Sequence, residues 1–191
     1  MSFADELGQV RSRHRIAGGD INDAWAVELE SGERLFVKTR ANAPAGEYEA
    51  EAAGLRWLGE AITVPDVIAV GDDFLALRWI DEGALDDEAL GRDLAALHAA
   101  GAPGFGFTPH DLPLHLGAAE LPSGEAEDWA TFYARWRIAP LADQACERGA
   151  LSREGRAAIE RVCERMADPD PAVRERAARA WCDWEDSHVR V

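Results

Sequence analysis

The feature that most constrains this chain is a glycine turn between two apolar runs, followed by a third run that ends in a lysine. Residues 10–17 and 23–30 are predicted to be strands, with Gly18 and Gly19 in the turn between them. A third strand is predicted at residues 34–38. Because tight turns join the three runs, the pattern predicts an antiparallel meander.

One helix and two further strands are predicted after the meander. Residues 47–59 are rich in Ala, Glu and Leu, with apolar residues at helical spacing. Residues 65–70 and 74–80 are two more apolar runs, separated by a turn that begins at Gly71. The order of elements predicts an α+β fold whose N-terminal part is a five-stranded antiparallel sheet with one helix.

The second half of the chain is predicted to be a partial helical lobe. Residues 81–83 are expected to be a hinge, so the predicted domains are an N-terminal lobe, residues 1–82, and a C-terminal lobe, residues 83–191. Residues 102–124, rich in Gly, Pro and His, are expected to form a long loop. The helices are expected at residues 86–100, 126–148, 153–167 and 172–182.

Composition limits the classes of partner. A formal net charge of -16 and a pI near 4.6 repel phosphate backbones, so nucleic-acid binding is not expected. No apolar stretch approaches the ~20 residues that span a bilayer, and the N-terminus lacks the pattern of a signal peptide. The three cysteines, Cys146, Cys163 and Cys182, lack metal-ligand spacing, so we expect no metal site from them and a cytoplasmic location.

Lys38 and Glu51 are the residues with the clearest chemical interpretation. Lys38 ends an apolar strand, and Glu51 follows thirteen positions later in the predicted helix. A strand lysine paired with a glutamate on the next helix is the arrangement by which kinases hold the α and β phosphates of ATP. Two alternatives stay open: Lys38 extends to solvent, or Glu47 or Glu49 takes the place of Glu51.

Two other segments are candidates for nucleotide binding. The backbone N–H groups of Gly18 and Gly19 are able to close over phosphates, although two glycines between strands also serve as a simple hairpin turn. Arg78, Trp79 and Ile80 end the last strand, where a kinase backbone meets the adenine edge. The alternative for these three residues is a buried strand that enters a linker.

Several motifs, taken in order, resemble the fructosamine kinase (ketosamine-3-kinase) family over about residues 8 to 165. They are the segments at 17–25, 35–39, 49–55, 64–65, 91–98, 105–107 and 128–137. The resemblance implies a protein-kinase-like fold, related to aminoglycoside and choline kinases. It also implies transfer of the γ-phosphate of Mg-ATP to a sugar hydroxyl of a small glycated amine. Gly18 and Gly19 would cover the phosphates, Lys38 would hold them, Glu51 would orient Lys38, and residues 78–80 would line the adenine pocket.

The catalytic loop of the family has a weaker counterpart here. The family pattern is His-Gly-Asp-Leu-Trp, two residues and Asn, with a later Asp that binds Mg²⁺. Residues 181–189 are the best match and agree only at Asp183 and Val189, so Asp183 is the one catalytic candidate, with an exposed tail carboxylate as its alternative. We expect the chain to end before the magnesium aspartate, which disfavours efficient turnover by this chain alone.

Two other interpretations of the chain stay open. The first is a pseudokinase or half-kinase that retains ATP binding or pairs with another chain, with self-association through an exposed face of its C-terminal lobe. The second is a frameshifted or decayed reading frame, because the Arg- and Ala-rich run at residues 174–180 and the segment after it fit no family pattern. An amphipathic helix with a solvated tail is the simpler explanation of that run.

Overall fold

The N-terminal part of the chain is a five-stranded antiparallel sheet, as predicted. The computed structural model describes residues 3–17, 21–117 and 119–166. The strand order is β1-β2-β3-β5-β4, so the two strands after the helix add to the β3 edge of the meander. The strands are β1 (Val10–Ile16), β2 (Asp23–Leu29), β3 (Arg34–Thr39), β4 (Val67–Val70) and β5 (Phe74–Arg78).

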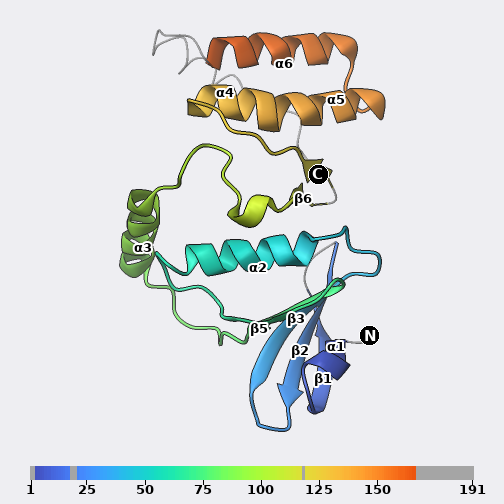
Figure 1. The fold of residues 1–191 in the computed structure, drawn as a ribbon, viewed down its shortest axis with the longest axis vertical. Coiled ribbons are helices and arrows are strands. Elements are labelled where there is room, and N and C mark those ends of the chain that lie inside the picture. Colours follow the sequence, from blue (N-terminus) through green and yellow to red (C-terminus); the bar gives the residue numbers. More distant parts are fainter. Residues whose placement is uncertain (1–2, 18–20, 118, 167–191) are drawn as a thin grey trace. The chain divides into compact units, whose positions relative to one another are not determined.

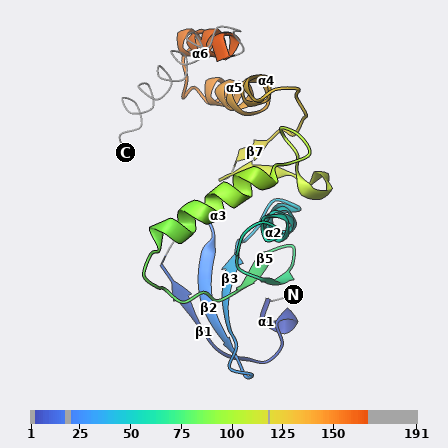
Figure 2. The same cartoon turned by 90° about the vertical axis from the view of Figure 1, so that its left-hand side faces the viewer.

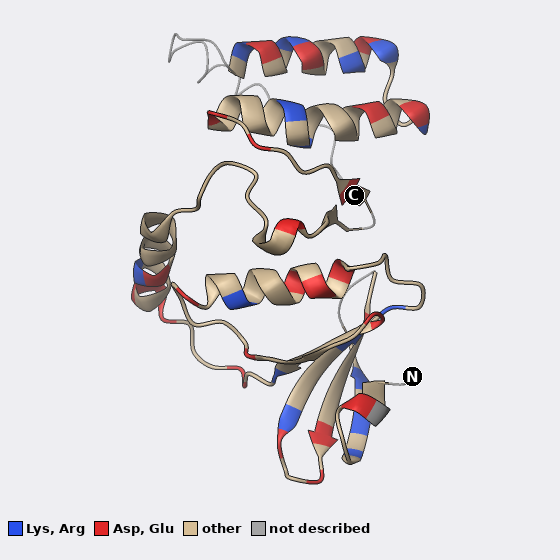
Figure 3. Cartoon of the chain, in the orientation of Figure 1, with Lys and Arg blue, Asp and Glu red and all other residues tan. Residues whose placement is uncertain are grey.

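Helix α2 (Glu47–Leu58) covers one face of this sheet (Figure 1). Its composition favours helix, and its charges suit the helix dipole: acidic residues occupy the first turn and Arg56 the last (Figure 3). Gly46, which precedes the helix, has a φ of 78°, a conformation that glycine adopts without strain. The short helix α1 (Phe3–Glu6), which the sequence pattern did not predict, lies against the opposite face.

Alternation along the strands places a separate apolar cluster on each side of the sheet. The cluster on the α1 side consists of Phe3, Val27, Leu35, Val37, Phe74 and Ala76. The cluster on the α2 side consists of Tyr48, Ala52, Leu75 and Leu77. The pairing register of β3 and β5 is therefore fixed, since a slip of one residue would move the residues of each cluster to the opposite face of the sheet.

Beyond the sheet, the first compact unit continues through helix α3 (Asp87–Ala100). The Asp86 carboxylate accepts a hydrogen bond of 2.9 Å from the Ala89 N–H and caps this helix. Helices α2 and α3, both seen in Figure 2, line a cavity of about 460 Å³ through Leu58 and Leu97, among others.

The prediction of a long loop over residues 102–124 was wrong in part. The segment contains a 3-10 turn, η1 (Pro109–Asp111), and a small hairpin of β6 (Leu114–Leu116) and β7 (Ala119–Leu121). Elements of three residues are too short to show a helical or strand period in the sequence, which is why the pattern missed them.

The second compact unit is helical. It begins with residues 102–107 and resumes at Leu121, whereas residues 1–101 and 108–120 form the first unit. The predicted division between residues 82 and 83 stays a prediction. The helices are α4 (Trp129–Tyr133), a π-helical turn η2 (Ala134–Ile138), α5 (Ala139–Glu147) and α6 (Arg153–Met166).

The predicted helix at residues 126–148 begins later than the pattern indicated. Asp128 caps α4 by accepting hydrogen bonds from the N–H and the hydroxyl of Thr131, and these bonds lower the pKa of its carboxyl group. A capping residue has extended backbone angles, so helical geometry begins only at Trp129. Helices α5 and α6 are joined by an ion pair of 2.6 Å between Asp143 and Arg156. The predicted helix at 172–182 lies outside the described residues.

Candidate functional site

Lys38 on β3 and Glu51 on α2 lie together as a doubly hydrogen-bonded ion pair. The Lys38 Nζ atom is 2.8 Å from Glu51 Oε1 and 2.7 Å from Oε2. The Lys38 side chain is 23% exposed and that of Glu51 is 37% exposed, so the pair is reachable from solvent yet held against the sheet. An ammonium fixed in this way keeps one of its three N–H donors for a further acceptor.

The pairing settles which glutamate lies beside Lys38. Glu47 forms its own ion pair with Arg40, with an N–O distance of 3.2 Å, and both side chains are largely buried. Glu49 is exposed on the outer face of α2. Glu51 is therefore the helix carboxylate that contacts Lys38, although its role with a nucleotide stays a prediction.

The register of the sheet explains why Lys38 lies on the α2 side. Lys38 lies opposite Ala24 on β2 and opposite Leu75 on β5, and opposed residues of antiparallel strands share a face. Leu75 is fully buried in the cluster beneath α2. The lysine stem is thus held between a small residue and a buried one, and its ammonium extends to the helix.

The part of this sheet face next to Lys38 carries small and apolar residues, with His14 beside Ala26. By register, Ile16, Ala24, Ala26 and Phe36 lie on it beside the lysine. Ala24 and Ala26 are buried, and they leave the β2 part of this surface without a large side chain.

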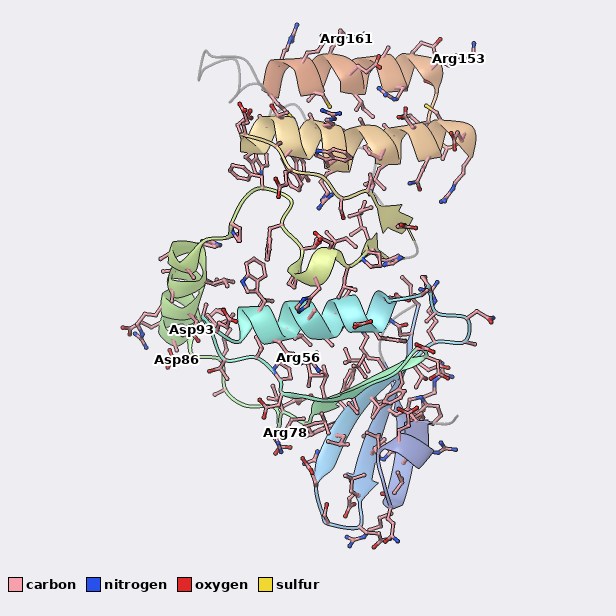
Figure 4. All side chains as sticks on the ribbon, viewed as in Figure 1. Arg56, Arg78, Asp86, Asp93, Arg153 and Arg161 are labelled. Atoms are coloured by element: carbon pink, nitrogen blue, oxygen red, sulfur yellow. The ribbon has the colours of Figure 1, made fainter. Side chains whose placement is uncertain are left out.

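Arg78 is the last residue of β5, Trp79 and Ile80 follow it, and the three side chains have different surroundings. Arg78 lies opposite Leu35, on the face away from Lys38, and Figure 4 shows it on the side of the sheet away from α2. Its guanidinium bonds Asp66 at 2.8 Å and Glu33 at 2.9 Å, and the hydrogen bond to Asp66 is the main cause that raises the pKa of Arg78. The Ile80 side chain is 62% exposed.

Trp79 is held in place by two residues that the sequence pattern did not single out. The Arg34 guanidinium lies 4.5 Å from the centre of the Trp79 ring, in a cation–π contact. The Asp81 carboxylate accepts hydrogen bonds from Arg34 at 2.7 Å and from the Trp79 indole at 3.0 Å. These contacts fix the start of the predicted hinge against β3.

Tyr48 and Asn22 are further residues of this region that the pattern missed. The buried Tyr48 hydroxyl donates a hydrogen bond of 3.0 Å to Asn22 Oδ1. Burial, together with the charges of Glu47 and Glu51, raises the pKa of Tyr48 well above its usual range. No sequence signal predicts this bond, since a tyrosine in an apolar helix face is normally read as packing alone.

Three of the predicted site residues, Gly18, Gly19 and Asp183, lie outside the residues that the structure describes. Within the described ranges, no group of three or more His, Cys, Asp or Glu side chains is arranged to hold a metal ion. No helix in the described part is long and apolar enough to cross a membrane.

The family model for fructosamine kinases matches residues 3–174. The chain belongs to the fructosamine kinase family. A relative from Thermus thermophilus named "Probable ketoamine kinase TTHA1179" is 36% identical over 140 residues, which are 70% of this chain and 48% of that protein. A rice relative, "Protein-ribulosamine 3-kinase, chloroplastic" of Oryza sativa subsp. indica, is 31% identical over 134 residues, which are 64% of this chain and 38% of that protein.

The solved structures agree with this assignment. The crystal structure of a "putative fructosamine-3-kinase" from Thermobifida fusca superposes with a TM-score of 0.76 at 33% identity, covering 89% of this chain and 64% of that one. The predicted protein-kinase-like α+β fold is confirmed. The chain spans about half the length of the curated relatives it matches.

Proposed function

We propose that this chain binds the phosphates of ATP through Lys38 and serves the phosphorylation of a glycated amine at a sugar hydroxyl. The observation that supports the proposal most strongly is the ion pair between Lys38 Nζ and the two Glu51 oxygens. It is the arrangement by which kinases hold the α and β phosphates. The names of the relatives supply the acceptor class, a ketoamine.

The charge distribution supports this role for Lys38. The chain carries a net charge of -16, and Lys38 is its only lysine. Arg40 is engaged by Glu47, and Arg78 lies on the opposite face of the sheet. Arg34 lies on the same face as Lys38, but its guanidinium bonds Asp81 and stacks on Trp79. The Lys38 ammonium, which Glu51 holds in place, is therefore the proposed phosphate ligand on this face.

The apolar surface beside Lys38 is proposed to receive the adenine ring. The ring would lie on Ala24 and Ala26, with its edge toward the backbone of residues 79–80 beyond β5. The contacts of Arg34 and Asp81 with Trp79, together with the 3.1 Å hydrogen bond from the Trp79 N–H to the Arg34 carbonyl, would hold that backbone beside β3. The cavity beside Trp79 measures about 100 Å³, below the ~300 Å³ of ordinary ligand pockets, so the base would extend beyond it along the sheet.

The residues present suit the phosphate chain of ATP better than its magnesium ion. Mg²⁺ prefers carboxylate and water oxygens, and the described residues include no cluster of that kind near Lys38. We therefore assign no residue of the described ranges to Mg²⁺. Asp183 is kept as the proposed catalytic carboxylate, and a cytoplasmic location is part of the proposal.

The experiment that tests this function is incubation of the chain with Mg-ATP and fructosyl-lysine. Phosphorylated product and ADP are measured by mass spectrometry, and ribulosyl-lysine serves as a second acceptor because a relative is named for it. Product that requires both ATP and Lys38 supports the proposal. The Arg92→Met variant is a matched control for Lys38→Met, since Arg92 is an exposed cation paired with Glu88 on α3.

Two other outcomes have distinct meanings. ATP binding that depends on Lys38, without product, would favour the alternative of a half-kinase that binds nucleotide but does not turn it over. Absence of ATP binding at millimolar concentration would overturn the nucleotide site itself.

A further inference from the structure

The first turn of α2 is tied to the sheet at two points. Arg40, which follows β3 directly, pairs with Glu47. Tyr48, the next residue, donates its hydroxyl hydrogen to Asn22, the residue before β2. Both bonds connect the start of the helix to residues next to the paired ends of β2 and β3, where Asp23 lies opposite Thr39.

Tyr48 also shares a helix face with Glu51. Residues three positions apart on a helix are neighbours, and the Glu51 charge is one of the influences that raise the pKa of Tyr48. The Tyr48 ring packs in the cluster that contains Leu75, and Leu75 is the residue opposite Lys38 on β5. Tyr48 is therefore a helix neighbour of Glu51 and packs in the same cluster as Leu75, the residue opposite Lys38.

The hydroxyl of Tyr48 makes a hydrogen bond that the ring alone could not make. Tyr48 is 1% exposed, so phenylalanine would preserve the packing of its ring. The hydrogen bond spans twenty-six positions of sequence and joins the helix to the strand that carries Ala24, the other neighbour of Lys38. Without it, the Asn22 amide oxygen loses a buried donor and the first turn of α2 loses one of its two ties.

We propose that Tyr48 is a positioning residue, whose hydroxyl, bonded to Asn22, sets the place of α2 on the sheet and so holds Glu51 against Lys38. The inference rests on the proposed function, because its effect is read through the affinity for ATP. Its claim is narrower: Tyr48 acts on the phosphate-binding lysine only through Glu51.

The test is a double-mutant cycle on the full chain, with the Kd of ATP measured by calorimetry. Tyr48→Phe is expected to weaken ATP binding about fivefold, the equivalent of one hydrogen bond, and to leave adenosine binding unchanged, since adenosine lacks phosphates. In the Glu51→Gln background the same change is expected to have no further effect, because the group through which Tyr48 acts is already lost.

Matched controls separate positioning from a general loss of structure. Tyr133→Phe alters the only other tyrosine, which lies on α4 in the second unit and stacks on Trp129. It is expected to leave the Kd of ATP unchanged. Asn22→Ala removes the acceptor of the same bond and is expected to weaken ATP binding at least as much as Tyr48→Phe.

The outcomes distinguish this inference from the proposed function. If the unaltered chain does not bind ATP, the proposed function fails, and with it the basis of the inference. If the chain binds ATP but Tyr48→Phe binds it equally well, or if the effects of Tyr48→Phe and Glu51→Gln simply add, the positioning role is overturned while the nucleotide site stands.

Discussion

Lys38 on β3 lies directly opposite Leu75 on β5, a residue with no exposed surface, and its ammonium contacts both carboxylate oxygens of Glu51. A charged group thus emerges from the buried centre of the sheet rather than from its edge. The cost of holding a cation there is offset by its bidentate partner and by its remaining access to water. We interpret Lys38 as a cation held in position for an anionic ligand.

Replacement of Glu51 by glutamine should free Lys38 and weaken ATP binding. The loss of a hydrogen bond to a charged group corresponds to about 2 kcal/mol, or roughly a thirtyfold rise in the Kd of ATP. Calorimetric titration with ATP measures it. Glu49→Gln is the matched control, because Glu49 is exposed on the same helix, and it should leave the Kd within about twofold of the original value. Equal Kd values for the two variants would contradict the account.

The buried hydroxyl of Tyr48 should make stability fall at high pH. Its pKa in the folded chain is raised above the ordinary 10.0, mainly by burial. The neutral hydroxyl therefore contributes its full stability below about pH 10, and that contribution is lost as the pH rises from there toward the folded-state pKa. Urea denaturation followed by circular dichroism at about pH 8 and about pH 11 measures the difference.

The control for this pH dependence is a comparison of two variants. Tyr48→Phe should lack the part of the alkaline loss that Tyr48 causes, whereas Tyr133→Phe should keep it. Stability curves that run parallel for the unaltered chain and Tyr48→Phe between these pH values would contradict the assignment.

Gly106 should not tolerate a side chain. Its φ of 88° is left-handed, and a Cβ atom there would overlap the Gly124 carbonyl oxygen and lie 2.8 Å from the Phe132 ring. Gly106→Ala is expected to destabilise the chain by about 2 to 4 kcal/mol. Thermal unfolding checks this, with Gly104→Ala as control, since a Cβ at Gly104 meets no atom within 4 Å. A Gly106→Ala protein as stable as the Gly104→Ala protein would contradict the described geometry.

The cluster on the α1 side of the sheet should depend on Phe74. This ring is fully buried and packs with Phe3, at a centroid distance of 6.3 Å. Phe74→Ala is expected to cost about 3 to 5 kcal/mol of unfolding free energy. Phe105→Ala, at a position that is 42% exposed, should cost far less, and denaturant titration of both variants makes the comparison. Similar losses for the two would show that Phe74 is not part of the core.

The elements that the sequence predicted well are those long enough to show their characteristic hydrophobic pattern. Short apolar runs between turns, such as residues 35–37, and the helical spacing of Ala52 and Leu55 were enough to predict the sheet and α2. The contact between Lys38 and Glu51 was also foreseeable, because one residue ends a strand and the other occupies the helix that follows it.

Other features depend on contacts that no local pattern encodes. The bond from Tyr48 to Asn22 and the packing of Arg34 on Trp79 each join residues far apart in the sequence. Their geometry follows from strand register and from the placement of α2 on the sheet, which become visible only in three dimensions. The late start of α4, in contrast, has a local cause: Asp128 caps the helix and has no helical geometry itself.

The most direct measurement uses the fact that Lys38 is the only lysine of the chain. An acyl-phosphate derivative of ATP transfers its acyl group to an amine beside the phosphates, with formation of an amide and release of ATP. Mass spectrometry is expected to find one modified lysine, Lys38, whose labelling is blocked by excess ATP and is slower in Glu51→Gln. Labelling of Lys38 that excess ATP does not reduce, or no labelling at all, would contradict the claim that this lysine holds the phosphates.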